Sequence, residues 1–191
     1  MTIRPAHSAD APAIAQLHAS SWQTAYRGIL LDAFLDGPLL ENRHALWRDR
    51  LSLDARADQF VVVDEQAGEI RGFACAFFDA DPEWGTLLDN LHVVPKLKGR
   101  GLGRQLISAT AAAVMRNTAN PQLHLWAYEQ NRAARRFYER LGGILTATEE
   151  EPALDGSRVR AVRYCWRELS ELVRHGVAGE ERGTDGFIPR R

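Results

Sequence analysis

A basic, glycine-rich turn in the middle of the chain has the composition of an anion site. Gly99, Gly101 and Gly103 alternate there, after an apolar strand and before a predicted helix. Glycine lets the backbone turn sharply and approach a ligand, and no Ser, Thr, Asp or Asn caps the first amides of this helix. The cations around these amides are Lys98, Arg100 and Arg104. Free amides, helix dipole and cations together favour a phosphorylated ligand.

The spacing of the turn excludes two common phosphate motifs. A P-loop requires Gly-x-x-x-x-Gly-Lys-Ser/Thr, and no Lys-Ser/Thr pair stands at the required distance from Gly99. A dinucleotide fingerprint requires Gly-x-Gly-x-x-Gly, whose last position falls here on Arg104 or Leu106. The spacing alone therefore leaves an anion site or a plain strand-to-helix turn with surface cations.

Two motifs resemble the acetyl-CoA-binding elements of the GCN5-related N-acetyltransferase (GNAT) family. The first is Lys-x-x-Gly-x-Gly at residues 98–103, after a strand that ends in Leu-His-Val-Val-Pro at residues 91–95. The second is Asn-x-x-Ala-x-x-Phe-Tyr-Glu-x-Leu-Gly at residues 131–142, which resembles the second cofactor helix of the family. The resemblance covers residues 2–167. Lys98 stands where the family carries Gln or Arg, and it would meet phosphate as a point charge rather than a planar fork.

The resemblance implies transfer of an acetyl group from acetyl-CoA, as co-substrate and without a metal, to a primary amine of a small molecule or peptide. In the family the pantetheine arm lies along the central strand like an additional β-strand, and an asparagine reaches it from the other side. The cofactor residues carried over by position are Leu91, His92, Val93, Lys98, Gly99, Arg100, Gly101, Leu102, Gly103, Arg104, Asn131 and Tyr138. Two alternatives stay open: a non-catalytic acyl-CoA-binding sensor or interaction module on the same fold, and an unrelated nucleotide-binding α/β protein.

Two groups are expected to assist the departure of the thiol and the build-up of negative charge. Tyr138 matches the general acid of the family, since its hydroxyl can protonate the departing sulfur. The alternative for Tyr138 is simple packing beside Phe137. The amide of Val93, at the strand end where the family bulges, is the expected hydrogen-bond donor to the developing oxyanion.

The general base is predicted among the polar residues of the same strand. Asp89 and His92 are the candidates, with a water relay or Glu83 as alternatives. Asp89 and His92 are an odd number of positions apart, so they face opposite sides of a regular strand unless a bulge resets the pleat. Asn90 shares the face of His92.

Aromatic residues of the N-terminal region are the predicted contacts of the acceptor, because the helices there overhang the reactive end of the cofactor in the family. They are Trp22, Tyr26 and Trp47. Such rings could hold a cationic amine by cation–π attraction, and packing in the core is the alternative. Acidic residues nearby, Asp32, Asp36 and Glu41, could attract a cation or form a solvated face.

Composition favours one globular enzyme domain. The chain has 191 residues, of which 45% are hydrophobic and 26% charged, and its net charge of -1 argues against a nucleic-acid partner. Cys75 and Cys165 lie in apolar runs and are predicted to be core residues rather than a disulfide or metal site. With no signal segment or membrane-spanning run apparent, a cytoplasmic protein without a membrane partner is expected. A homodimer is expected from the resemblance.

The elements that must position these residues follow from periodicity. In chain order the pattern predicts a strand at 2–4, a helix capped by Asp10, a helix at 40–53, strands at 59–64, 70–78 and 86–93, a helix at 102–116, a strand at 123–127, a helix capped by Asn131, and strands at 144–149 and 159–167. The expected fold class is α/β: a mixed, mostly antiparallel central sheet of about six or seven strands flanked by helices, with one parallel βαβ crossover. The resemblance names it the acyl-CoA N-acyltransferase fold. Residues 1–167 would form the domain and residues 168–191 a flexible or partner-docked tail.

Overall fold

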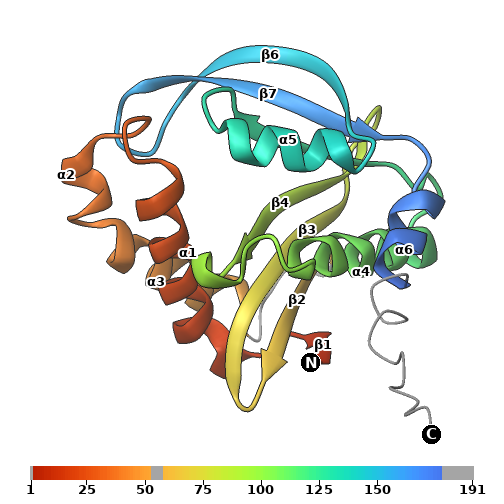
Figure 1. Ribbon diagram of the computed structural model, residues 1–191, viewed down its shortest axis with the longest axis horizontal. Helices are drawn as coiled ribbons and strands as arrows, with labels where there is room; N and C mark the ends of the chain where they lie inside the picture. Colours follow the sequence, from red (N-terminus) through yellow and green to blue (C-terminus); the bar gives the residue numbers. More distant parts are fainter. Residues whose placement is uncertain (1, 53–57, 178–191) are drawn as a thin grey trace, which may run out of the picture.

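A seven-stranded sheet forms the centre of the computed structural model, which describes residues 2–52 and 58–177 (Figure 1). The strands are β1 (Thr2–Pro5), β2 (Gln59–Gln66), β3 (Glu69–Asp81), β4 (Gly85–Val93), β5 (Leu123–Tyr128), β6 (Ile144–Pro152) and β7 (Arg158–Trp166). The helices are α1 (Ala11–Ala25), α2 (Asp32–Leu35), α3 (Leu39–Arg50), α4 (Leu102–Asn117), α5 (Arg132–Arg140) and α6 (Ser170–Val177). Single 3-10 turns occur at Ser8–Asp10 and Pro95–Leu97.

The strand order confirms the predicted mixed sheet. It runs β1-β2-β3-β4-β5-β7-β6, and every neighbouring pair is antiparallel except β4 and β5. The parallel pair is joined by α4, as the predicted βαβ crossover requires. In these two strands, both fully described, pairing is confined to Thr86 with Leu123 and Leu87 with His124. The sheet therefore opens between β4 and β5 after residue 87.

A β-bulge interrupts β4 within this open stretch. The pairing with β3 passes from Leu88 opposite Ala76 to Asn90 opposite Cys75, so Asp89 has no opposing residue. The bulge shifts the pleat by one position, which is why side chains three residues apart share a face. The bulge lies at Asp89, between the strand start and His92, whereas the resemblance implied one at the strand end beside Val93.

Each face of the sheet is covered by different helices. One apolar core joins α4 and α6 to β-strand residues such as Ala74 and Leu88, and the other joins α1 and Trp47 of α3 to Phe73 and Cys75. Figure 1 shows α1, α2 and α3 gathered at one side of the view and α4 with α6 at the other. The prediction for the cysteines is confirmed, since Cys75 and Cys165 are both buried free thiols.

Two details of the N-terminal region differ from the sequence-based expectation. Asp10 precedes α1 without capping it: its carboxylate pairs with Arg4 at 2.7 Å and accepts the amide hydrogen of His7 at 2.9 Å. Helix α3 ends at Arg50, three residues before the predicted end at Leu53, which lies outside the described residues. The carboxylate of Asp10 therefore joins β1 to the start of α1 instead of binding helix amides.

The segment expected to be a tail begins with ordered structure. Helix α6 occupies residues 170–177 and packs against α4, with Leu169 and Leu172 buried in the core. Ser108 of α4 donates its hydroxyl hydrogen to the carbonyl of Val173 at 3.0 Å. Of the expected flexible or partner-docked tail, residues 170–177 are helical and pack on the domain, and residues 178–191 lie outside the described part of the chain.

Candidate active site

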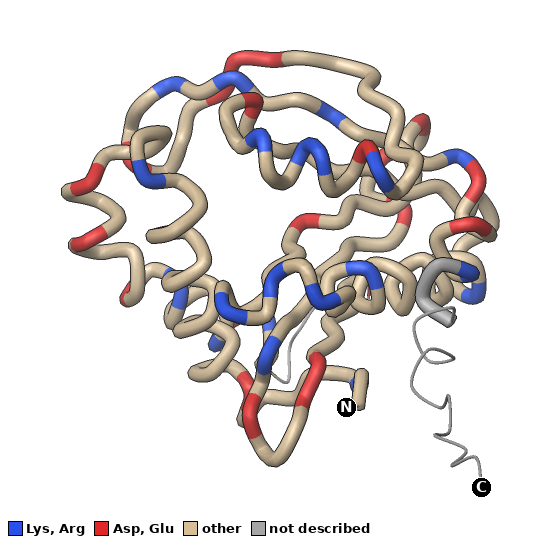
Figure 2. Tube along the Cα trace, viewed as in Figure 1, with Lys and Arg blue, Asp and Glu red and all other residues tan. Residues whose placement is uncertain are grey.

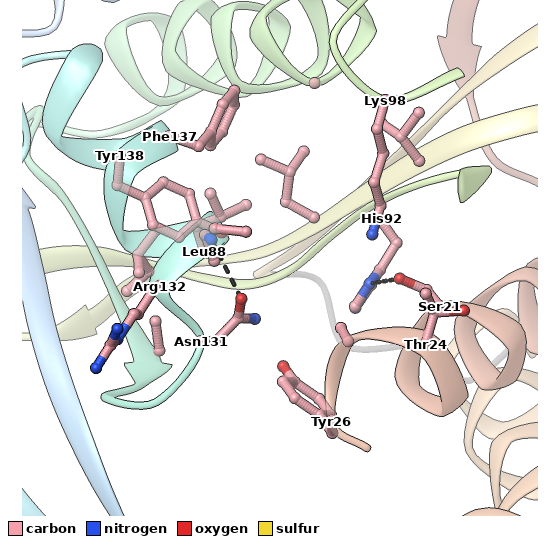
Figure 3. A pocket seen from close by; sticks show the side chains of 18 of the residues that line it. Ser21, Thr24, Tyr26, Leu88, His92, Lys98, Asn131, Arg132, Phe137 and Tyr138 are labelled. Atoms are coloured by element: carbon pink, nitrogen blue, oxygen red, sulfur yellow. Dashed lines mark hydrogen bonds between the residues drawn. The ribbon is translucent and has the colours of Figure 1, made fainter. Parts of the chain in front are cut away.

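A cavity of about 1340 Å³ lies where β4 and β5 separate. Its walls come from the end of α1, from β4 and β5, from the turn before α4 and from α5, and Figure 3 shows its lining side chains. This volume exceeds the usual range for pockets that bind drug-sized molecules. The cavity therefore has room for a large ligand.

The glycine turn forms one wall of this cavity, and its backbone has the geometry expected of an anion site. Gly99 and Gly101 have φ angles of 81° and 87°, in the left-handed region that favours glycine. Gly101 precedes α4 without a side-chain cap, and the first amide bonded back to it is that of Gln105, at 3.1 Å. The amides of residues 102–104 therefore have no partner within the helix and can bind an anion.

Gly103 lets α4 and α5 approach each other beside the turn. A Cβ atom on Gly103 would lie 3.3 Å from Cζ of Phe137, closer than most such contacts. The glycine therefore sets the distance between the two helices that enclose the cavity. Leu102, which was predicted among the cofactor contacts, is buried in the core and does not line the cavity with its side chain.

Basic side chains line the cavity from both sides. Lys98 and Arg104 come from the turn and the start of α4, and Arg132 and Arg140 come from α5. Figure 2 shows Lys and Arg along the start of α4 and along α5. Arg100, predicted as a contact, is exposed and does not line the cavity. Sequence reasoning missed the two α5 arginines, although the high arginine content of that helix was a signal for them.

The edge of β4 offers backbone donors to the cavity. Leu91, His92 and Val93, which were predicted as cofactor contacts, line it. The amide of Val94 donates to the carbonyl of Arg71 on β3 at 2.8 Å. Because amides alternate in direction along a strand, those of residues 91 and 93 face away from β3, toward the open space beside β5. A ligand with an extended amide chain can pair with them as a further strand would.

Helix α5 contributes Asn131 and Tyr138 to the opposite wall. Asn131 caps the helix, as predicted, since its side-chain oxygen accepts the amide hydrogen of Ala134 at 3.2 Å. Burial raises the pKa of Tyr138 above its ordinary value of 10. The phenol therefore keeps its proton at neutral pH and can serve as a proton donor.

His92 is held in a neutral state at the inner end of the cavity. Its Nδ1 atom lies 2.9 Å from the hydroxyl oxygen of Ser21, a contact drawn in Figure 3. Its ring lies over that of His18, with 4.6 Å between the ring centres. Burial, with the nearby cation Lys98, lowers the pKa of His92 to about 3. The imidazole is therefore uncharged across the physiological range.

The bulge brings the second predicted base to the same place. Asp89 and His92 both line the cavity, although regular alternation would have separated them. Asp89 also pairs with Arg50 of α3, with 2.6 Å between Oδ2 and Nη1. Glu83 is exposed in the turn before β4 and does not line a cavity described here, so the structure does not support it as a base.

A smaller cavity of about 360 Å³ adjoins the first. The residues shared by the two walls are Tyr26, Asp89, His92 and Trp126. Further side chains of α1, α3, β5 and β6 complete the smaller one. Two ligands, one in each cavity, would therefore meet at these shared residues.

The three aromatic residues predicted to contact the acceptor lie in different environments. Tyr26 and Trp22 line the smaller cavity, but the guanidinium of Arg43 lies 4.7 Å from the ring centre of Trp22 and covers one face. The prediction of acceptor contact is wrong for Trp47, because its side chain is fully buried and its Nε1–H donates to Nδ1 of His18 at 2.9 Å. Trp47 therefore belongs to the core.

The predicted acidic patch is largely neutralised. Arg27 pairs with Asp32 at 2.9 Å and with Asp36 at 2.7 Å. Neither carboxylate lines a described cavity. The arrangement fits the solvated face that was the alternative to cation binding.

Within residues 2–52 and 58–177, no group of three or more His, Cys, Asp or Glu side chains could hold a metal ion. In the same part of the chain, no helix has the length and apolar character needed to cross a bilayer.

Comparison with known proteins gives the family. The model of the acetyltransferase (GNAT) family matches residues 14–143. The uncharacterized N-acetyltransferase YuaI of Bacillus subtilis (strain 168) is 27% identical over 175 residues, which cover 90% of this chain and 96% of that relative. The 5-NmdU N-acetyltransferase of Pseudomonas phage PaMx11 is 40% identical over 84 residues, or 44% of this chain and 56% of that protein.

A solved structure shares the fold. The structure of yncA from Salmonella typhimurium, with its cofactor acetyl-CoA, superposes with a TM-score of 0.62 at 24% identity, over 87% of this chain and 92% of that one. The family match spans more than half of this chain and contains the glycine turn, the bulged strand β4 and helix α5. The chain belongs to the GNAT family of acetyltransferases.

Proposed function

We propose that this protein transfers the acetyl group of acetyl-CoA to a primary amine of a small molecule or peptide. In this reaction the neutral amine attacks the thioester carbonyl directly. The main support for the proposal is the opening between β4 and β5. Free helix amides and cations lie at its rim, and a second cavity adjoins it. The first cavity suits the donor and the second suits the acceptor. The shared wall at Asp89 and His92 is where the two would meet.

The residues around the larger cavity fit the chemical parts of acetyl-CoA. The amides of residues 102–104 would bind the diphosphate, and Lys98, Arg104, Arg132 and Arg140 would balance its charge. The edge of β4 would pair with the amides of the pantetheine arm through residues 91 and 93. The side-chain NH₂ of Asn131 is available to the same arm, since its oxygen is engaged in the helix cap.

Residues at the inner end of the cavity would assist the transfer. Acetyl-CoA supplies an activated acetyl group in a thioester, which a neutral amine can attack. The amide of Val93 would donate a hydrogen bond to the carbonyl oxygen as it gains negative charge. Tyr138, protonated at neutral pH, would deliver its proton to the departing sulfur.

Asp89 and His92 would orient the amine rather than act as strong bases. The low pKa of His92 leaves its imidazole a hydrogen-bond acceptor or donor with little affinity for a proton. Asp89 is already paired with Arg50. The amine would therefore lose its proton through water beside these two groups, and activity should rise with pH toward the pKa of the amine itself. The cytoplasmic location and the homodimer expected from the sequence remain predictions.

Two measurements test the proposal. Acetyl-CoA should raise the midpoint of thermal unfolding, whereas NAD and ATP should leave it unchanged, because a ligand of the native state stabilises it. Release of free thiol from acetyl-CoA should then require an amine from a panel of amino acids, polyamines, aminoglycosides and short peptides. Tight binding of acetyl-CoA with no amine-stimulated thiol release would favour the acyl-CoA sensor instead.

A further inference from the structure

A buried guanidinium without a charged partner lies in the wall of the smaller cavity. Arg43, on α3, has 5% of its surface exposed. Its Nε and Nη2 atoms donate to the side-chain oxygen of the adjacent Asn42, and Nη1 has no hydrogen-bond partner in the described part of the chain. Within the same residues, no carboxylate lies at ion-pair distance from it. The guanidinium also lies over the ring of Trp22, with 4.7 Å to the ring centre, but this contact does not neutralise its charge. Because burying a cation without a counter-ion is costly, a cation in a cavity wall indicates an anionic ligand.

The electrostatic surroundings of Arg43 support the same conclusion. Burial, together with repulsion from Arg50, lowers the pKa of Arg43 to about 10. Arg43 is therefore still protonated at neutral pH, but at a cost to the protein. A bound anion would offset this cost.

The remaining charges of the smaller cavity indicate which charged groups a complementary ligand carries. Arg50 is neutralised by Asp89 at 2.6 Å and also donates to the side-chain oxygen of Asn90 at 2.8 Å. Glu151 is the other carboxylate in the wall, and burial, with repulsion from Glu149, raises its pKa. After the Arg50–Asp89 pair is set aside, the wall offers one cation and one carboxyl group. This combination is complementary to a molecule that carries both an anionic group and an amine.

The size and lining of the cavity restrict the ligand further. Its volume of about 360 Å³ is at the small end of the range for small-molecule sites. Apart from the charged groups, the wall is mainly aromatic and aliphatic, with Trp22, Tyr26, Leu46, Trp126, Tyr128 and Leu154. Such a wall suits an apolar side chain on a small molecule.

We propose that the acceptor is a small amine that also carries a carboxylate, as an amino acid does, and that Arg43 binds this carboxylate. The inference rests on the proposed acetyl transfer and narrows its substrate class. A guanidinium has several N–H groups in one plane and binds carboxylate in a defined orientation. The amine of such an acceptor would then be directed to the wall that the two cavities share, beside Asp89 and His92.

The test compares each of the twenty standard L-amino acids with its carboxamide, in which the negative charge is absent. Initial rates of thiol release from acetyl-CoA are measured for the wild-type protein, for Arg43→Gln and for Arg48→Gln. Arg48 is a matched control, since it lies exposed on the same helix and does not line either cavity. The carboxamides have the less basic amine, so a higher rate with the amino acids would not come from amine deprotonation.

For the best amino acid, kcat/KM in the wild type and in Arg48→Gln should exceed that of its carboxamide by roughly 30-fold or more, as expected when a buried charge pair is lost. In Arg43→Gln the ratio of the two kcat/KM values should fall to about one, with the affinity for acetyl-CoA retained. Equal rates on acid and carboxamide in the wild type would overturn the proposal even if Arg43→Gln failed to fold. Turnover only of amines that lack a carboxylate would overturn it while leaving acetyl transfer intact. The absence of turnover with any amine would contradict the proposed function as well.

Discussion

The two cavities differ in how the chain builds them. The larger one is formed mainly by two segments, residues 88–104 and 125–141, together with the end of α1 and the residues that follow it, and it includes the free amides at the start of α4. The smaller one is assembled from side chains of α1, α3, β4, β5 and β6, which are far apart in sequence. A site made of backbone and short motifs is fixed by local geometry, whereas a site made of scattered side chains depends on the complete fold. Local geometry therefore fixes the proposed donor site, whereas the proposed acceptor site depends on how five elements pack together.

The strongest test of the donor side is removal of the proposed acid. Tyr138→Phe removes one hydroxyl without changing the packing of the ring, so the departing sulfur loses its proton donor. We expect kcat to fall by about 100-fold or more, with the dissociation constant for acetyl-CoA nearly unchanged in calorimetry. Equal losses in kcat and in affinity would contradict the role of Tyr138 as an acid.

The glycine turn should control affinity rather than turnover. Gly101→Val forces a β-branched residue into a left-handed conformation and distorts the start of α4, so acetyl-CoA affinity should fall roughly 100-fold. Gly68→Val is the matched control, because Gly68 has a φ of 81° with open space around it and lies in the turn between β2 and β3. Both variants should lose stability, but Gly68→Val should bind acetyl-CoA as the wild type does. Similar loss of affinity in both would show that the turn acts through stability alone.

The arginines of α5 should make a smaller contribution to binding. We expect Arg132→Gln and Arg140→Gln each to weaken acetyl-CoA binding by about three- to tenfold, with a weaker dependence on salt, because each removes one cation that faces the phosphates. Arg136 lies exposed on the same helix and does not line the cavity, so Arg136→Gln serves as the control. Calorimetry at low and high salt provides the measurement. An effect of Arg136→Gln as large as that of the other two would indicate that the positive charge of α5 attracts acetyl-CoA at long range, rather than that Arg132 and Arg140 contact it.

The smallest predicted effect concerns the histidine at the shared wall. Because the pKa of His92 is about 3 in the folded protein and near 6.5 when unfolded, the unfolded chain binds more protons below pH 6.5. The free energy of unfolding should therefore fall as pH is lowered, and His92→Gln should reduce this fall by about 1 kcal/mol between pH 7 and 5.5. Urea denaturation at both pH values measures the difference. Parallel pH dependence in the two proteins would contradict a neutral, buried His92.

Much of the fold and of the donor site could be predicted from the sequence, because their signals are local. Alternating and helical apolar periods predicted the strands and the crossover around the glycine turn, and the two motifs predicted most of the cavity wall from Leu91 to Arg104 and from Asn131 to Tyr138. Within these segments the pattern did not show which side chains reach the cavity. Arg100 and Leu102 belong to the first motif but do not line the cavity, and the proposed role of residue 102 rests on its backbone amide.

The smaller cavity could be predicted only in part, through Trp22, Tyr26, Asp89 and His92, because its other residues become neighbours only through tertiary packing. In the sequence, Trp47 and Trp22 are both tryptophans of the N-terminal region and cannot be told apart. In the structure, Trp47 is buried against His18, whereas Trp22 lines the smaller cavity. Arg43 gave no signal in the sequence, since an arginine on a helix is normally exposed. The bulge at Asp89 likewise depends on pairing with β3, and it decides that both Asp89 and His92 reach the cavities.

A crystal structure with bound coenzyme A tests the central claim most directly, namely that the opening between β4 and β5 holds the donor beside a separate acceptor cavity. The diphosphate should lie on the amides of residues 102–104, the pantetheine amides should pair with the backbone of residues 91 and 93, and the sulfur should lie near the hydroxyl of Tyr138. The smaller cavity, lined by Arg43, should stay free of the cofactor. Coenzyme A bound elsewhere, or extending into the smaller cavity, would contradict the account.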